Sequence, residues 1–173
     1  DAPRHRESLL VPLAFAALAL FFAVTGPAAA HSGWFARGTA DAHRLAAEPW
    51  RMVTALTLHA DLPHVLGNVV SGAIFGSAVS RRIGPGAALL GLVVAGTAGN
   101  ALNAVHHLGG GHLSVGASTA VFAAVGLLAG TQIVLSRQRR SSRRRSLREL
   151  LTPLAGGLAL LGALGASPET DLW

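Results

Sequence analysis

The stretch that decides the fold reads WRMVTALTLHADLPHVLGN and covers residues 50–68. Its D-L-P triplet at 61–63 is a helix-start pattern, because aspartate caps free backbone N–H groups and proline is tolerated in the first turn. His64 and Asn68 follow four residues apart, so both lie on one face of the expected helix. The stretch therefore predicts an apolar helix that carries two polar side chains near its beginning.

Long apolar blocks on both sides of this stretch indicate a membrane protein. Only 13% of the residues are charged and the mean hydropathy is +0.48, whereas soluble domains carry about 25% charged residues. Each block is long enough to cross about 30 Å of hydrocarbon at ~1.5 Å per residue. We therefore predict an all-α fold, a polytopic membrane helix bundle that forms one domain over residues 1–173. Its predicted spans cover residues 9–25, 63–80, 85–105, 115–135 and 147–165.

The arginines indicate how these spans are oriented. All fourteen basic residues are arginine: two precede the first span, two follow the second, and seven follow the fourth. These three regions lie on one side if every block crosses, and the positive-inside rule places that side in the cytoplasm. We expect a cell-membrane protein with a cytoplasmic N-terminus and with loops 26–62 and 106–114 outside. The arginine cluster at 137–148 then anchors a loop on anionic lipid, and no nucleic-acid partner is expected.

Two features of the spans have alternative interpretations. The first block has the basic start and Ala-rich exit of a signal peptide, but its length and the four later blocks favour a retained anchor. Glycines spaced four apart occur at Gly72 and Gly76 and at Gly126 and Gly130. Such pairs let membrane helices approach closely, and we assign both pairs to packing alone.

The fourth span opens with GASTAVF at residues 116–122. A serine in the first turn of a buried helix lies beside free backbone N–H groups and the positive end of the helix dipole. The same groups could stabilise an oxyanion formed when Ser118 attacks a carbonyl. Taken alone, such a serine is more often a helix cap, and Ser114 competes for that role here. Likewise, His64 and Asn68 alone are as easily explained by hydrogen bonds that pack two helices together.

Considered together, these segments resemble the rhomboid family of intramembrane serine proteases. Residues 50–68 resemble the family's W-R-x-x-T segment leading into H-x-x-x-x-H-x-x-x-N, and Gly116-Ala117-Ser118 resembles its G-x-S motif, two spans later. The resemblance implies a six-helix bundle with a water-filled cavity that opens outward. The substrates implied are transmembrane or juxtamembrane segments of proteins in the lipid bilayer, and no metal or cofactor is implied.

The resemblance also implies a role for each site residue. Ser118 is expected to be the nucleophile, and His64 and Asn68 are expected to form the oxyanion hole with the backbone N–H of Ser118. Phe122 occupies the position where the family places an aromatic ring against the catalytic histidine. His59 stands where relatives often have a histidine that supports the outer loop by hydrogen bonding, and we assign it a structural role.

Two departures from the family pattern affect the expected activity. The general-base histidine of rhomboids lies near the start of the sixth span, and here the S-P-E pattern at 167–169 opens a sixth helix at about residue 168. We expect the base histidine just beyond residue 173, so that residues 1–173 alone are inactive by the family mechanism. Thr119 stands where many relatives have glycine, and its β-branched side chain could crowd the cavity.

Functions other than proteolysis have less support in the sequence. His106, His107 and His112 lie in the short loop before Ser118 and could bind a metal, but their spacing matches no defined site. A catalytically inactive rhomboid-like protein that binds transmembrane helices is the main alternative, and a sixth span without histidine would favour it. A small transporter is disfavoured because no inverted repeat or broken-helix pair is visible.

Overall fold

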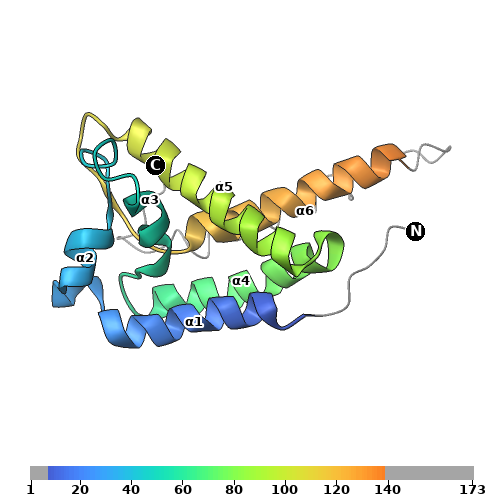
Figure 1. Ribbon diagram of the computed structural model, residues 1–173, viewed down its shortest axis with the longest axis horizontal. Helices are drawn as coiled ribbons and strands as arrows, with labels where there is room; N and C mark the ends of the chain where they lie inside the picture. The colour runs from blue at the N-terminus through green and yellow to red at the C-terminus, as the bar shows by residue number, and fades with distance from the viewer. Residues whose placement is uncertain (1–7, 139–173) are drawn as a thin grey trace.

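The computed structural model describes residues 8–138, and these residues are mostly helical (Figure 1). Four long helices dominate: α1 (Leu10–Thr25), α4 (Leu62–Ile83), α5 (Pro85–His106) and α6 (Ser118–Gln138). They coincide with the first four predicted spans. The predicted fifth span at 147–165 and the start of a sixth at about 168 lie outside the described residues.

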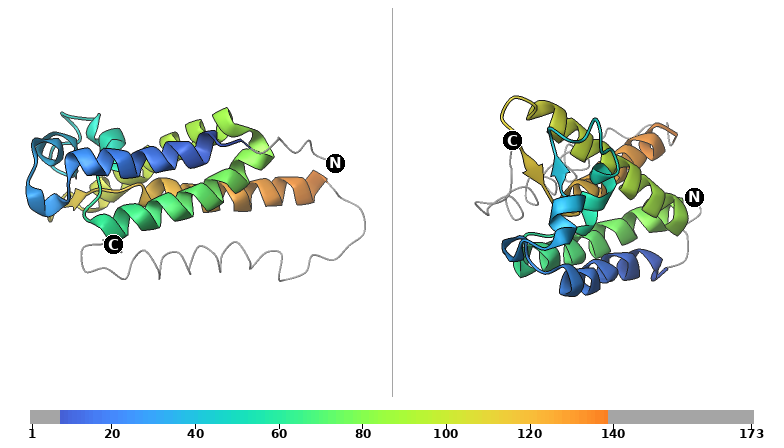
Figure 2. Two further views of the ribbon diagram at one scale, coloured as in Figure 1. Left: turned by 90° about the horizontal axis from the view of Figure 1, so that it is seen from below. Right: turned by 60° about the vertical axis from the view of Figure 1, so that its left-hand side comes forward.

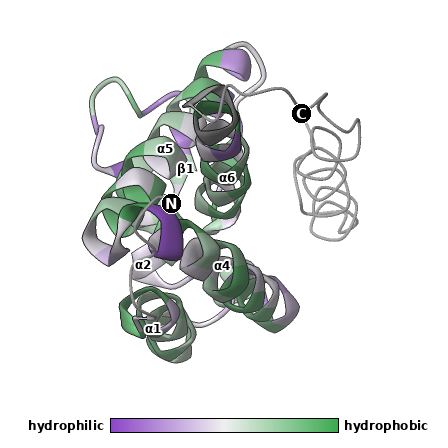
Figure 3. Cartoon of the chain, turned by 90° about the vertical axis from the view of Figure 1, so that its right-hand side faces the viewer, coloured by the Kyte–Doolittle hydropathy of each residue, from purple (hydrophilic) through white to green (hydrophobic). Residues whose placement is uncertain are grey.

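Within residues 8–138, three helices are long and apolar enough to cross a membrane. They cover Leu10–Ala30, Leu62–Ile83 and Pro85–His106, while α6 has a shorter apolar stretch over Ser118–Val134. Large apolar side chains are exposed on these helices, whose ribbons are mostly coloured as hydrophobic in Figure 3. Exposed apolar side chains on a helix with few charges suit contact with lipid. The exposed set includes Leu13, Leu20, Val70, Ile74, Leu90 and Val94.

Helix α1 packs along α4 through the first glycine pair (Figures 1 and 2). A Cβ on Gly72 would stand only 2.1 Å from the ring of Phe15, and one on Gly76 would stand 2.7 Å from Val11. The absence of side chains therefore lets the Phe15 ring lie directly on the α4 backbone. The packing role predicted for this pair is confirmed. At Gly126 and Gly130 no described residue comes within 4 Å of such a Cβ, so the described chain offers these two glycines no close helix contact.

Helices α5 and α6 also approach closely, but through glycines of α5. A Cβ on Gly96 would lie 3.0 Å from the Cβ of Ala120, and one on Gly99 would lie 3.1 Å from the Cβ of Thr119. A core made mainly of small and branched side chains joins α1, α4, α5 and α6. The first turn of α6 is therefore pressed against α5 and fixed in position. The fully buried members of that core include Val11, Val79, Ala88, Val121 and Ala124.

The segment between α1 and α4 forms a small folded layer at one end of the bundle. It contains η1 (Ala28–Ala30), α2 (Gly33–Gly38), β1 (Ala40–Asp41), α3 (Arg51–Thr54) and η2 (Ala55–Thr57). Strand β1 pairs antiparallel with β2 (Leu113–Ser114), so that Ala40 lies opposite Ser114 (Figure 2). This two-residue ladder was not predicted, and it ties the layer to the residues that lead into α6.

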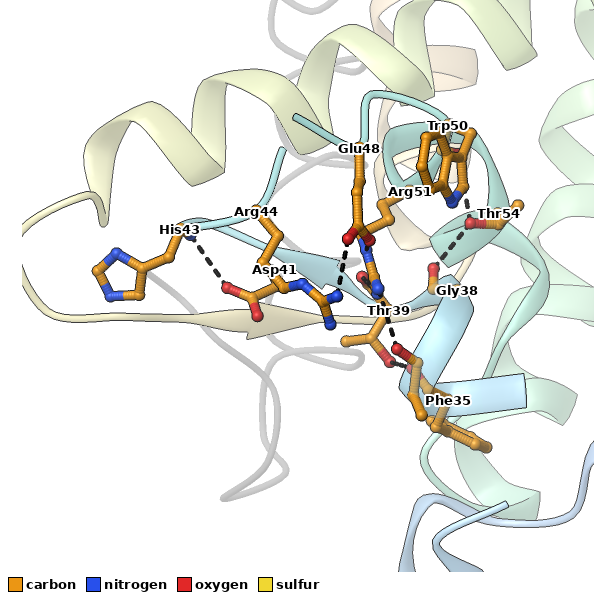
Figure 4. A network of polar contacts seen from close by, with 11 residues as sticks. Phe35, Gly38, Thr39, Asp41, His43, Arg44, Glu48, Trp50, Arg51 and Thr54 are labelled. Atoms are coloured by element: carbon orange, nitrogen blue, oxygen red, sulfur yellow. Dashed lines mark hydrogen bonds and ion pairs between the residues drawn. The ribbon is translucent and has the colours of Figure 1, made fainter. Parts of the chain in front are cut away.

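Arg51 organises this layer (Figure 4). Its side chain is 3% exposed and forms an ion pair with Glu48. Its two terminal nitrogens donate to the carbonyl oxygens of Thr39 and Ala36, each at 3.0 Å. A guanidinium can satisfy three acceptors in one plane, so Arg51 binds α2, β1 and α3 together.

Replacing Arg51 with alanine is expected to lower the free energy of unfolding by about 3 kcal/mol, because hydrogen bonds to charged groups contribute roughly 1.5–3 kcal/mol each. Arg51→Lys should recover only part of this loss, since an ammonium cannot reach the three acceptors together. Thermal unfolding in detergent measures both, with the exposed Arg37→Ala as the control. Equal unfolding midpoints for Arg51→Ala and Arg37→Ala would contradict the role of Arg51 in stabilising this layer.

Glu48 makes the layer sensitive to acid. The hydrogen bond from Arg51 lowers the pKa of Glu48 below its ordinary value of 4.5, the charges of Arg44 and Arg51 assist, and partial burial opposes. A carboxyl whose pKa is lower when folded stabilises the fold above its unfolded pKa and loses that contribution as pH falls through its folded pKa. We expect Glu48→Gln to flatten the decline in the unfolding midpoint below about pH 4.5. If the unfolding midpoint fell equally steeply with decreasing pH in the wild-type protein and in Glu48→Gln, the contribution of Glu48 would be contradicted.

Candidate active site

Ser118 is the first residue of α6 and is half-buried. The chain enters this helix through Gly116, whose φ of +114° favours glycine. The N–H of Gly116 donates to the carbonyl of Ala55 at 2.9 Å. The competing cap candidate, Ser114, lies in β2 and accepts a hydrogen bond from the side chain of Asn103 at 2.6 Å. Ser118 therefore follows a tight, tethered turn that leads into the helix.

Gly116 brings this turn against the two polar residues of α4. A Cβ built on Gly116 would stand 2.6 Å from Nε2 of His64 and 3.6 Å from Nδ2 of Asn68. Only a residue without a side chain lets the backbone come so close to an imidazole and an amide. The structure thus brings the turn that carries Ser118 together with His64 and Asn68, residues from two helices and two distant parts of the sequence.

The start of α4 places those two side chains. Asp61 caps the helix by accepting a hydrogen bond from the backbone N–H of His64 at 2.7 Å, as the sequence predicted. Asn68 is fully buried, and its Nδ2 donates to the carbonyl of His64 at 3.0 Å. An amide nitrogen has two hydrogens, so one N–H of Asn68 remains for another acceptor. Its Oδ1 has no hydrogen-bond partner among residues 8–138.

His59 makes a hydrogen bond of the supporting kind that the resemblance implied, and the structure shows which backbone group it holds. It is fully buried, its ring meets that of His64 edge-on at 5.3 Å, and its Nε2 accepts from the backbone N–H of Ala117 at 3.4 Å. Burial lowers its pKa to about 4, with a smaller effect from His64, while the backbone of Thr57 opposes the shift. His59 is therefore neutral at physiological pH and supports the residue before Ser118. The sequence signal for this contact was the H-x-x-x-x-H pattern, which places His59 five residues before His64.

Thr119 points to α5. Its hydroxyl donates to Oδ1 of Asn100 at 3.3 Å, and its β-carbon faces Gly99. Asn100 in turn donates from Nδ2 to the carbonyl of Met52 at 2.7 Å. Thr119 therefore makes an interhelical contact, and its effect on the cavity stays a prediction. Phe122, one turn further along α6, packs against the bundle core.

The outer-loop histidines cluster without forming a recognisable metal site. His107 and His112 stack with centroids 4.4 Å apart, and His106 meets His107 edge-on at 4.9 Å. Within the part of the chain that the structure describes, no three histidine or acidic side chains are arranged to hold a metal ion. Gly111 lies against the ring of His43, so this cluster joins the two outer loops.

The family description "Rhomboid domain" matches residues 46–167, well over half of the sequence. The chain belongs to the rhomboid family. No curated protein and no solved structure matched it. The rhomboid match includes residues 50–68 and the 116–118 turn, whereas α1 precedes it. Rhomboid proteins are intramembrane-protease-like membrane proteins whose substrates are other membrane proteins.

Proposed function

We propose that this rhomboid protein is an intramembrane serine endopeptidase that cleaves transmembrane or juxtamembrane segments of membrane proteins. The observation that supports this most is the position of Gly116, which sets the Ser118 turn against His64 and Asn68. A nucleophile at a helix start, beside two side chains that can donate hydrogen bonds, fits acyl transfer to water. The active site opens to the outer face, and the N-terminus lies in the cytoplasm.

In the proposed mechanism the Oγ of Ser118 attacks the scissile carbonyl carbon. The hydroxyl proton passes to a general-base histidine, the second member of the proposed dyad. The carbonyl oxygen becomes an oxyanion that accepts hydrogen bonds from the N–H of Ser118 and from the side chains of His64 and Asn68. The histidine then protonates the leaving amine, and water hydrolyses the acyl-enzyme by the reverse sequence. No metal or cofactor takes part in this scheme.

His59 is poorly suited to be that base. Its Nε2 already accepts the N–H of Ala117, and full burial gives it a pKa of about 4. A general base works best with a pKa near the operating pH and with access to the proton that it removes. The base of the proposed dyad is therefore an imidazole other than that of His59.

Loss of either oxyanion donor is expected to lower kcat strongly. His64→Ala and Asn68→Ala should each reduce kcat by about 10²-fold, the usual effect of one well-placed donor. The Michaelis constant should change little, because the donors bind the developing charge more strongly than the ground-state carbonyl. Steady-state cleavage of a labelled transmembrane substrate measures both constants. Wild-type kcat in both variants would remove these residues from the oxyanion hole.

The proposed activity is tested with the protein expressed from its complete gene and reconstituted in proteoliposomes. A labelled single-span substrate should be cut within or next to its membrane segment, and a metal chelator should leave the rate unchanged. A substrate that binds but stays intact, with a correctly folded protein, would instead favour a rhomboid-like protein that holds transmembrane helices without cutting them.

A further inference from the structure

Three hydrogen-bonded links join the start of α6 to the segment at residues 52–59. The N–H of Gly116 donates to the carbonyl of Ala55 at 2.9 Å. The N–H of Ala117 donates to Nε2 of His59 at 3.4 Å. The third link runs through α5 and joins Thr119 to the carbonyl of Met52. These links attach positions 116, 117 and 119, on both sides of Ser118, to one short segment.

The third link crosses between helices through one side chain. Asn100 is 3% exposed and uses both ends of its amide, accepting from Thr119 and donating to the carbonyl of Met52. A buried amide satisfied at both ends holds its two partners in one geometry. The first turn of α6 and the start of α3 are therefore held in register by a residue of α5.

The 52–59 segment is itself held firmly. Arg51, directly before it, is buried and bonded to carbonyls of α2 and of the residue before β1. Within it, Ala55 and His59 are fully buried and Leu58 is 2% exposed. A rigid element that contacts a reactive group's neighbours can set the position of that group without touching substrate.

We propose that His59 and Asn100 are positioning residues for Ser118, which hold its Oγ at the oxyanion donors of α4 by fixing residues 117 and 119. The inference deepens the proposed peptidase function and rests on it for its kinetic consequences. A displacement of about 1 Å at a reacting atom can cost about 10²-fold in rate. The position of the nucleophile thus depends on the folded outer layer as well as on the membrane helices.

The chemistry of His59 makes the inference testable with similar variants. Only a neutral ring nitrogen can accept the N–H of Ala117, and the amide oxygen of glutamine can occupy nearly the same place as an imidazole Nε2. Leucine fills a similar volume but has no acceptor. For the third link, Thr119→Ser keeps the hydroxyl, whereas Thr119→Val keeps the shape and removes the hydroxyl. The exposed His106→Leu serves as the control for loss of an imidazole.

The first measurement is kcat and the Michaelis constant for the complete protein and these variants. We expect His59→Leu to lower kcat at least 10-fold with little change in the Michaelis constant, and His59→Gln to recover most of that loss. Thr119→Val should lower kcat several-fold and Thr119→Ser should not. Equal kcat for His59→Gln and His59→Leu, or wild-type kcat in both His59→Leu and Thr119→Val, would overturn the proposal.

A second measurement does not depend on catalysis. Hydrogen exchange of the peptide around Ala117 should be slow in the wild-type protein and in His59→Gln, and faster in His59→Leu. If the wild-type protein cleaves no substrate, the peptidase proposal fails, and the exchange rates alone decide whether His59 holds this turn. Identical exchange in all three proteins would overturn the positioning role even in an active enzyme.

Discussion

Ser118→Ala is expected to abolish substrate cleavage while leaving the fold intact. The Oγ of Ser118 is the protein atom that forms the acyl bond with substrate in the proposed mechanism, and removing such a nucleophile costs on the order of 10⁶-fold in kcat. The fold should tolerate the change, because Ser118 is half-buried and alanine suits a helix. Cleavage of a reconstituted transmembrane substrate and the unfolding midpoint measure the two effects.

Ser114→Ala is the matched control for this prediction. Ser114 lies four residues earlier and bonds Asn103 in the ladder region, outside the proposed reaction. The Ser114→Ala variant should keep at least a tenth of the wild-type rate. A tenfold loss of rate corresponds to about 1.4 kcal/mol of activation free energy. Retained cleavage in Ser118→Ala, by protein free of contaminating protease, would exclude Ser118 as the nucleophile.

Gly116→Ala is expected to reduce cleavage at least 10²-fold, for two structural reasons. The new Cβ would stand 2.6 Å from Nε2 of His64, so either the imidazole or the turn must move. The φ of +114° is also strained for any residue with a side chain, at a cost of about 1–3 kcal/mol. Both effects displace Ser118 from an oxyanion donor, and the unfolding midpoint should fall as well.

Gly109→Ala separates this effect from a general sensitivity of glycine positions. Gly109 lies in the same outer loop, has no positive φ, and meets no described atom within 4 Å of a built Cβ. Its variant should keep the wild-type rate and midpoint. Wild-type kinetics in Gly116→Ala would show that the turn does not need to lie against His64 and would remove the main structural support for the site.

The parts of the fold that local chemistry determines could be predicted from the sequence. Asp61 caps α4 because its side chain and the Leu62-Pro63 pair act within one helical turn. A close helix contact at Gly72, which the structure shows to be with Phe15, could be expected because small residues four apart let membrane helices approach closely. His64 and Asn68 share a face through helical spacing alone.

Contacts between distant segments escaped prediction, because they depend on backbone groups that sequence patterns do not mark. The carbonyls that Arg51 binds belong to Ala36 in α2 and to Thr39 just after it, and the acceptor of Asn100 is the carbonyl of Met52. The contact of Thr119 with α5 was not predicted either, because it depends on the close approach of that helix at Gly99. The β1–β2 ladder is likewise too short to give an alternating pattern.

The central claim is that the hydroxyl at the start of α6 is the reactive nucleophile, positioned by the outer layer and by α4. Treating the complete, folded protein with a fluorophosphonate and mapping the adduct by peptide mass spectrometry tests it most directly. We predict one adduct, on Ser118, formed much more slowly in His64→Ala and Gly116→Ala. An adduct on another residue, or none in protein that cleaves its substrate, would contradict the claim.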